Sequence, residues 1–312
     1  MRIIFCGTPD FAVPSLRRLC AHPEFSVEAV ITQPDRPRGR GRHISSSPVK
    51  EVALEAGLHV YQPETIKSDS SLDFLKRIAP DAVVIIAYGQ IIPARLLSVP
   101  RLGWINLHAS LLPRYRGAAP IHWAIANGET LTGLTTMQID AGMDTGPALQ
   151  QEKIEIGPEE TSPEVSARMS EAGADLVMDT LLKFDRGEIA PAPQDSANAS
   201  YARILKKEDG RIAWSRTAQQ TFNRMRGFTP WPGAFTTFRG QICHIWGRPE
   251  NAPAHGSLIA WGEIVFSNEG THAGCGEGTR LRLEFMQLEG RKRVTAKEFA
   301  NGAHLALGEQ FV

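Results

Sequence analysis

Short apolar runs separated by amphipathic stretches constrain the fold of this chain most strongly. Residues 2–6 (RIIFC) and 82–88 (AVVIIAY) carry almost no polar alternation, and 27–32 and 104–108 are further strand candidates. Apolar runs of this kind suit strands covered on both faces, as in a parallel sheet with helices on each side. Apolar residues recur at helical spacing over 11–19, 47–56, 72–78 and 164–184. The alternation predicts an α/β fold with a doubly wound, mainly parallel, Rossmann-like sheet.

The remainder of the chain predicts a second, smaller domain. Residues 187–200 (GEIAPAPQDSANAS) are rich in Pro, Ala, Ser and Asn and have little apolar periodicity, which is typical of a linker. A helix is expected at 217–225, followed by short strand candidates at 241–246, 258–260, 263–267 and 280–286. We therefore predict a first domain over 1–187, a linker over 188–205 and a small antiparallel barrel or sandwich over 206–312.

The composition is that of a globular protein without a membrane partner. With 312 residues, of which 42% are hydrophobic, the chain can bury the core of about two domains. No apolar run approaches the ~20 residues that a membrane span requires. The opening MRIIFCGTPDF also lacks the charged head, apolar middle and cleavage site of a secretory signal. The expected location is therefore the cytoplasm.

The cysteines give no sign of a metal site. Cys6, Cys20, Cys243 and Cys275 are scattered without CxxC or zinc-like spacing. We expect free thiols, no bound metal and no disulfide framework.

Charge is sorted along the chain although the net charge is zero. Residues 33–50 contain four arginines and Lys50 against Asp35 alone, and 201–250 contain nine Lys and Arg against three acids. Residues 140–195 have the opposite balance, with four basic residues against thirteen acids. The two basic segments could meet a polyanion, and the alternative interpretation is an ordinary solvated surface.

Two segments carry the strongest candidates for chemistry, INLHASLLPRYRGAAP at 105–120 and IDAGMDTG at 139–146. Side chains two apart on a strand share a face, so Asn106 and His108 should project together at a strand's carboxyl end, where open α/β sheets place their ligands. An amide beside an imidazole can stabilise a developing oxyanion, and the imidazole can also transfer a proton. Asp144, in a glycine-rich loop, could orient that imidazole, favour its charged form or accept a proton from an attacking amine. The alternative for His108 alone is a hydrogen-bonded structural residue.

Other chemistries have weaker support. The chain has no serine nucleophile elbow, no phosphate-binding glycine loop and no metal-ligand cluster. Gly7-Thr8-Pro9-Asp10 opens a helix but lacks the GxGxxG spacing of dinucleotide-binding proteins, which disfavours an NAD-dependent oxidoreductase. An RNA-binding module without catalysis could use the basic segments, but it would leave the three clustered polar residues unexplained.

The chain resembles the folate-dependent formyltransferases essentially from end to end. The similar segments, in order, are FCGTPDF at 5–11, TQPDRPRGRG at 32–41, SPVK at 47–50, AYGQIIP at 87–93, INLHASLLPRYRGAAP at 105–120 and MQIDAGMDTG at 137–146. The resemblance implies that Asn106, His108 and Asp144 are the catalytic residues. It also implies a folate pocket lined by Ser110, Leu111, Leu112 and Pro113, with 10-formyltetrahydrofolate as cosubstrate.

The same resemblance is strongest to the members whose acceptor is the methionyl group of initiator tRNA. It implies a monomer with a C-terminal β-barrel of oligonucleotide-binding type. It further implies that the arginine-rich 32–42 segment and the second domain contact tRNA. The residues expected to do so are Arg36, Arg38, Arg40, Arg42, Lys206, Lys207 and Arg211. The alternative acceptors are a sugar-nucleotide amine and glycinamide ribonucleotide, because the three catalytic candidates do not by themselves specify the acceptor.

Overall fold

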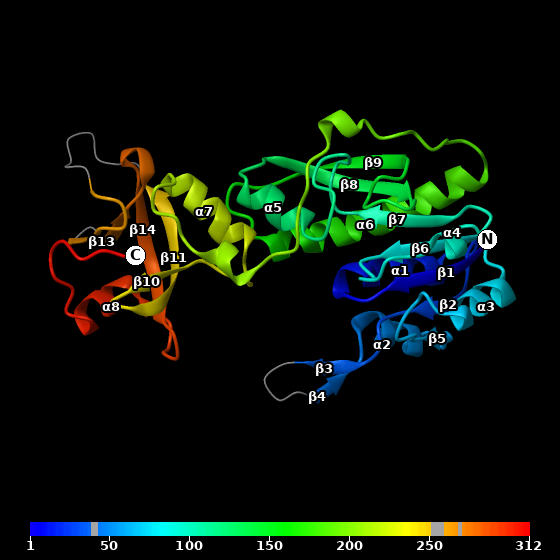
Figure 1. Cartoon of the computed structure of the whole chain (residues 1–312), viewed down its shortest axis with the longest axis horizontal. Coiled ribbons are helices and arrows are strands. Elements are labelled where there is room, and N and C mark those ends of the chain that lie inside the picture. Colours follow the sequence, from blue (N-terminus) through cyan, green and yellow to red (C-terminus); the bar gives the residue numbers. More distant parts are fainter. Residues whose placement is uncertain (39–42, 251–258, 268–269) are drawn as a thin grey trace. The chain divides into compact units, whose positions relative to one another are not determined.

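The computed structural model describes residues 1–38, 43–250, 259–267 and 270–312 (Figure 1). The chain divides into two compact units. Unit 1 comprises Met1–Pro120, Leu131–Glu155 and Glu164–Arg203, and unit 2 comprises Ile121–Thr130, Ile156–Pro163 and Ile204–Val312. Two short segments of unit 2 therefore interrupt unit 1 in the sequence.

Unit 1 is built on one mixed sheet that is mainly parallel. Its strands, in spatial order, are β5 (Val60–Tyr61), β2 (Ser26–Ile31), β1 (Arg2–Gly7), β6 (Ala82–Ile86), β7 (Trp104–His108), β8 (Leu131–Gln138) and β9 (Ala148–Glu155). The strands from β5 to β7 are parallel, and β8 and β9 extend the sheet in antiparallel pairing. Every residue of β6 is buried, as expected of a strand covered on both faces. The predicted α/β class is confirmed.

Helices cover this sheet, and local sequence explains where two of them begin. They are η1 (Asp10–Ala12), α1 (Val13–Ala21), α2 (Pro48–Glu55), α3 (Asp69–Ile78), α4 (Ala94–Leu97) and α6 (Ser162–Asp185). Ser47 and Ser68 cap α2 and α3 by accepting a backbone N–H from the first turn. Helix α6 lies directly on the sheet, because a Cβ on its Gly173 would come within 2.5 Å of Leu107 on β7.

The arginine-rich segment contains a regular pair of short strands. Within the described residues, β3 (Arg36–Arg38) pairs antiparallel with β4 (His43–Ser45). The regular pairing gives the segment a hairpin stem whose backbone groups are hydrogen-bonded across two strands.

Unit 2 is an antiparallel sheet with short helices packed against it. The strand order is β10 (Phe235–Phe238), β11 (Gln241–Glu250), β14 (Arg280–Leu288), β13 (Gly270–Gly274) and β12 (Ile264–Ser267), and β15 (Val294–Thr295) pairs with β14. Its helices are α5 (Pro120–Ala126), η3 (Lys207–Gly210), α7 (Ala218–Gly227), η4 (Gly276–Gly278) and α8 (Ala296–Gly302), whereas η2 (Ser196–Asn198) belongs to unit 1. The core of unit 2 includes Trp214, Phe238, Met286 and Phe299. The prediction of a smaller antiparallel β unit is confirmed.

Ile259 and Ala260, two residues of the strand expected at 258–260, are not part of a strand. Leu258 lies outside the described residues, while the carbonyl of Ala260 accepts the N–H of Glu263 at 3.0 Å and closes a turn. Gly262 in this turn has φ +76°, a conformation that ends an extended strand. Among the described residues, no helix is long and apolar enough to cross a membrane.

Candidate active site

Asn106 and His108 lie near the carboxyl end of β7, between a parallel and an antiparallel neighbour. Asn106 is opposite Ile85 on β6 and Met137 on β8, and His108 is opposite Thr135. Being two residues apart on one strand, they present their side chains on the same face. Asn106 is half-buried and His108 is only 6% exposed. The strand therefore fixes both polar groups at the sheet edge where ligands of open α/β sheets bind.

The hydrogen bond of His108 determines which ring nitrogen is available. Its Nε2 lies 2.9 Å from the carbonyl oxygen of Tyr115. A carbonyl oxygen can only accept, so Nε2 carries the proton and donates it. The other nitrogen, Nδ1, faces Asp144, with 3.7 Å between Nδ1 and Oδ2. In the neutral imidazole, Nδ1 is therefore a proton acceptor that points toward a carboxylate.

Asp144 stands in the loop between β8 and β9 and is held in an unusual backbone conformation. Its φ is +51°, in the left-handed region that non-glycine residues seldom adopt. Its Oδ2 accepts the N–H of Gly117 at 2.7 Å. Farther back in the loop, the Asp140 carboxylate accepts the Gly142 N–H at 3.0 Å and the Thr145 hydroxyl at 2.8 Å. The loop is thus ordered by its own acids and by the segment that follows β7.

The structure brings together side chains that lie far apart in the sequence. His108 and Asp144 face each other across 3.7 Å, and Asn106 shares the strand face of His108. A proton acceptor, a carboxylate and an amide donor near one sheet edge can stabilise an oxyanion and relay a proton.

The four residues expected to line a folate pocket occupy the turn after β7. Ser110 is fully buried, and its hydroxyl donates to the carbonyl of Arg114 at 2.6 Å. Leu112 is 5% exposed, and its N–H donates to the Thr135 hydroxyl at 3.1 Å. Leu111 and Pro113 are half-buried. Ser110 and Leu112 therefore shape this turn through contacts within the protein, and the role of all four in binding folate stays a prediction.

Sequence reasoning missed a partly buried polar network beside this site. Gln194 donates to the carbonyl oxygens of Asp144 and Gly146, and the buried Arg116 donates to Gln194. Arg116 lies within the segment 105–120, which the sequence already indicates as a candidate for chemistry. Gln194 lies in the segment interpreted as a linker, and its PAPQ sequence carries no recognisable signal.

The residues expected to contact tRNA are spread over both units and have varied surroundings. In unit 1, Arg36 is exposed on β3, and Arg38 is the last residue of that strand. Arg40 and Arg42 lie outside the described residues. In unit 2, Lys206, Lys207 and Arg211 are all exposed, next to or within η3. The tRNA contacts of all these residues stay predictions.

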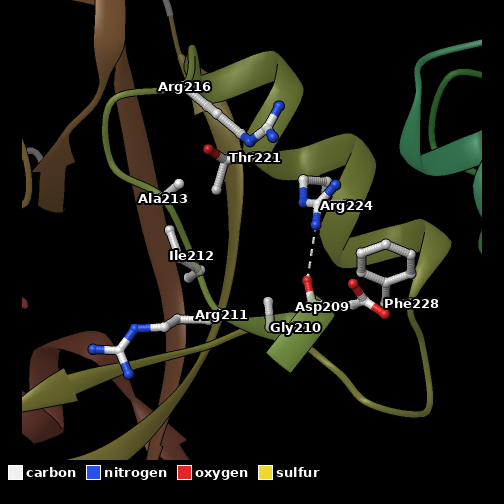
Figure 2. A pocket seen from close by; sticks show the side chains of 10 residues that line it. Asp209, Gly210, Arg211, Ile212, Ala213, Arg216, Thr221, Arg224 and Phe228 are labelled. Carbon is white, nitrogen blue, oxygen red and sulfur yellow. Dashed lines mark hydrogen bonds between the residues drawn. The ribbon is translucent and has the colours of Figure 1, made fainter. Parts of the chain in front are cut away.

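A small pocket of unit 2 is lined in part by Arg211 (Figure 2). The guanidinium of Arg224 donates to the backbone oxygen of Asp209 at 3.0 Å, while the side chain of Arg211 points away from both. Arg211 Nη2 lies 3.4 Å from the carbonyl oxygen of Val312. Arg224 thus serves the local packing, and Arg211 presents its charge at the surface.

The described part of the chain holds no group of three or more His, Cys, Asp or Glu residues arranged to bind a metal. Cys6, Cys243 and Cys275 are buried, and Cys20 is exposed. All four are free thiols.

Comparison with known proteins identifies the family. Residues 1–181 match the formyl transferase family, and residues 204–304 match the formyl transferase C-terminal domain. A methionyl-tRNA formyltransferase of Solibacter usitatus is 50% identical over 99% of this chain and 98% of its own length. One of Koribacter versatilis is 50% identical over 97% of this chain and 96% of its own length.

A solved structure supports the fold independently. The N-formyltransferase from Helicobacter canadensis, in complex with folinic acid and dTDP-3-aminofucose, superposes with a TM-score of 0.66 at 18% identity and covers 90% of this chain and 98% of its own. At that identity the likeness concerns the fold alone. On the family match over both units and the full-length relatives, this chain belongs to the formyl transferase family, among the methionyl-tRNA formyltransferases.

Proposed function

We propose that the chain transfers the formyl group of 10-formyltetrahydrofolate to the free amino group of methionyl initiator tRNA, giving N-formylmethionyl-tRNA for translation initiation. The observation that carries this proposal is the His108 Nδ1 facing the Asp144 carboxylate at 3.7 Å beside Asn106. The names of relatives that are 50% identical support the tRNA acceptor. The folinic acid in the Helicobacter canadensis structure supports a folate as the formyl donor.

The reaction is a direct transfer between two nitrogens. The unprotonated amine attacks the formyl carbon, the new C–N bond forms, and the carbonyl electron pair moves onto oxygen. An α-amino group titrates near ~8, so the neutral amine is accessible near neutral pH. The tetrahedral intermediate then collapses as its bond to the folate nitrogen breaks. The amide of Asn106 would stabilise the oxyanion of this intermediate, and Nδ1 of His108 would do so once it has accepted the proton that the amine loses.

The reaction also requires the transfer of one proton. The proton that the attacking nitrogen loses must reach the folate nitrogen that leaves. Nδ1 of His108 is the free ring nitrogen, because Nε2 is committed to the Tyr115 carbonyl. Asp144 accepts only the Gly117 N–H among the described groups, so its carboxylate retains lone pairs that can take a proton. We assign the relay to Asp144 and His108.

The rest of the assignment concerns binding. Residues 1–187 would carry catalysis, with Ser110, Leu111, Leu112 and Pro113 near the folate. Residues 206–312 would bind tRNA through Lys206, Lys207 and Arg211, joined to the first domain by 188–205. Arg36, Arg38, Arg40 and Arg42 would contact the acceptor end of the tRNA, since arginine suits both phosphate contact and stacking on bases. We expect a monomer that acts in the cytoplasm and needs no metal.

One assay tests the proposal. The enzyme is mixed with 10-formyltetrahydrofolate and methionyl initiator tRNA, and the released amino acid is analysed by mass for the formyl group. A parallel reaction offers dTDP-3-aminofucose, the sugar-nucleotide amine bound in the Helicobacter canadensis structure. Formylation of methionine alone is the expected result. Turnover of the sugar without formylation of methionine would overturn the acceptor, and no turnover of either would overturn formyl transfer to these amines.

A further inference from the structure

Gln194 connects the loop that carries Asp144 to a buried cation. Its side-chain Nε2 donates to the backbone oxygens of Asp144 at 2.9 Å and of Gly146 at 2.7 Å. Its Oε1 accepts from Arg116, at 3.1 Å from Nε and 2.7 Å from Nη2. One amide therefore uses both ends, its donor for the loop and its acceptor for the cation.

Arg116 is an unusual residue to find so deeply enclosed. It is 2% exposed, and arginine is seldom buried without a polar partner. Its backbone is also paired with the segment that contains Gln194, because its N–H donates to Ser200 at 2.8 Å and its carbonyl accepts from Ala202 at 2.7 Å. We call residues 194–202 the strap. The strap is thus bound to Arg116 by both its side chain and its backbone.

The strap also supports the two residues that flank Arg116 and contact the catalytic candidates. Tyr115, whose carbonyl takes the Nε2 proton of His108, donates its own N–H to the Ser200 hydroxyl at 2.9 Å. Gly117, whose N–H binds the Asp144 carboxylate, lies so close to the strap that a Cβ on it would be 2.7 Å from the Ala202 oxygen. The strap therefore supports the groups that orient His108 and Asp144.

We infer that Gln194 is a positioning residue for formyl transfer: it fixes the backbone of Asp144 in its left-handed conformation, with Arg116 as its anchor, so that the carboxylate faces Nδ1 of His108. A left-handed conformation at a non-glycine residue costs free energy and persists only where the surroundings impose it. The two hydrogen bonds from Nε2 supply that constraint at Asp144 and two residues beyond it. This inference rests on the proposed roles of His108 and Asp144.

Two substitutions of Gln194 distinguish a role in positioning Asp144 from a role in attaching the strap to Arg116. Gln194→Glu keeps an acceptor for Arg116 and so retains the attachment. It also replaces the donor with an oxygen that faces two carbonyl oxygens, which removes the constraint on Asp144. Gln194→Ala removes both interactions. Asn198→Ala is a matched control, because Asn198 is an exposed amide on the same strap whose side chain donates only to Asp195 among the described residues.

The experiment measures kcat and KM for 10-formyltetrahydrofolate and methionyl-tRNA, with the thermal unfolding midpoint, for the full chain and these variants. We expect Gln194→Ala and Gln194→Glu to lower kcat by about tenfold or more, since small displacements of a catalytic group have large effects on rate. Both KM values should change by less than about twofold, because ground-state binding does not depend on Asp144 in this mechanism. Gln194→Glu should unfold near the wild-type temperature, and Asn198→Ala should match the wild type throughout.

The experiment distinguishes a failure of the proposed function from a failure of the positioning role of Gln194. An inactive wild-type enzyme in this assay overturns the proposed function. An active wild type with a Gln194→Glu variant of equal kcat overturns the positioning role, even if Gln194→Ala is slow or unstable. If Gln194→Glu lowered kcat, raised both KM values and lowered the unfolding temperature together, Gln194 would have a structural role only, and this result would also overturn the inference.

Discussion

The edge of the sheet in unit 1 and the basic surface of unit 2 differ in how their polar groups are held. Around His108 and Asp144, contacts come from two separate segments of the chain, one with Tyr115 and Gly117 and the other with Gln194. Lys206, Lys207 and Arg211 are exposed instead. The side chains of the first region are held by hydrogen bonds from surrounding groups, whereas those of the second are exposed to solvent, and of these Arg211 contacts the Val312 carbonyl oxygen.

This difference follows from the physical demands of the two tasks. Transfer of a carbonyl needs groups placed within a fraction of an ångström, which requires a preorganised surrounding. Attraction of a polyanion needs charge at the surface, where water screens each contact and no single position is decisive. We therefore expect single substitutions to have large effects in the first region and small ones in the second.

The largest effect is expected from the catalytic candidates. His108→Ala, Asn106→Ala and Asp144→Ala should each lower kcat by about a hundredfold or more, because each removes a proton acceptor or an oxyanion donor. Steady-state formylation of methionyl-tRNA measures this, with circular dichroism to verify the fold. Near-wild-type turnover in a folded His108→Ala enzyme would remove that residue from the mechanism.

A smaller but still large effect is expected from Gly117→Ala. Its φ is +113° and its Cβ would lie 2.7 Å from the Ala202 oxygen, so the strap and the N–H that binds Asp144 must separate. We expect kcat to fall by about tenfold and stability by about 1–3 kcal/mol, measured by turnover and by denaturant unfolding. Gly57→Ala is the control, because Gly57 also has positive φ (+68°) but no atom within 4 Å of the added Cβ. If both variants keep full activity, the strap does not orient Asp144.

The sequence predicts the centre of the sheet well and its antiparallel edge poorly. Strand β6 is a run of five buried apolar residues, which has few interpretations. Strand β9 reads ALQQEKIE and is mostly half-buried or exposed, so it lacks the apolar signal that marks a strand. Its neighbour β8 contains Thr135 and Thr136, whose buried hydroxyls make hydrogen bonds that only the folded chain provides.

The sequence likewise predicts some residues of the candidate site and not others. Asn106 and His108 can be paired from strand periodicity, and Asp144 stands out in a glycine-rich loop. Gln194 and Arg116 are 78 positions apart, and neither residue type indicates that the other is its partner. The composition of 187–200 suggested a linker, because Pro, Ala and Ser form no apolar periodicity. Backbone pairing, as at Ala148 with Ala192, orders this segment without any apolar pattern.

A modest effect is expected from the basic surface of unit 2. The triple variant Lys206→Ala, Lys207→Ala and Arg211→Ala should raise KM for methionyl-tRNA by roughly tenfold at low salt, with little change in kcat and a shallower dependence on salt. Each single change should cost about twofold, because exposed charges act nearly independently. The comparison is a set of KM values for tRNA at several salt concentrations. If KM for tRNA depended on salt as steeply in the triple variant as in the wild type, the tRNA would have to bind at another surface.

Arg36 in the hairpin of unit 1 allows a comparable test against another arginine. Arg36→Ala should raise KM for methionyl-tRNA by about threefold at low salt if its charge meets phosphate. Arg18→Ala is the control, because Arg18 is paired with the carboxylates of Asp175 and Glu171 and is already neutralised. KM for tRNA at low and high salt measures both. Equal effects of the two substitutions would count against the hairpin as a tRNA contact.

The smallest effect on turnover is expected from a buried polar cluster in unit 2, which tests whether burial alone marks a functional site. His272 is 4% exposed, and its Nε2 lies 2.7 Å from Glu250, which also pairs with Arg280 at 2.8 Å. Burial, aided by the charge of Arg280, holds the pKa of His272 below its ordinary value. The unfolded histidine titrates near ~6.5, so the unfolded state binds more protons as the solution becomes acidic.

Stability should therefore fall as the pH drops from about 7 toward the lowered pKa of His272. In His272→Gln this contribution is absent, so the unfolding midpoint should decline less between about pH 7.5 and 5.5, while kcat at neutral pH stays within about twofold of wild type. The exposed His59→Gln variant should keep the wild-type pH dependence. A large loss of kcat in a stable His272→Gln enzyme would break the contrast between the units, because a buried network far along the chain from Asp144 would then also govern transfer.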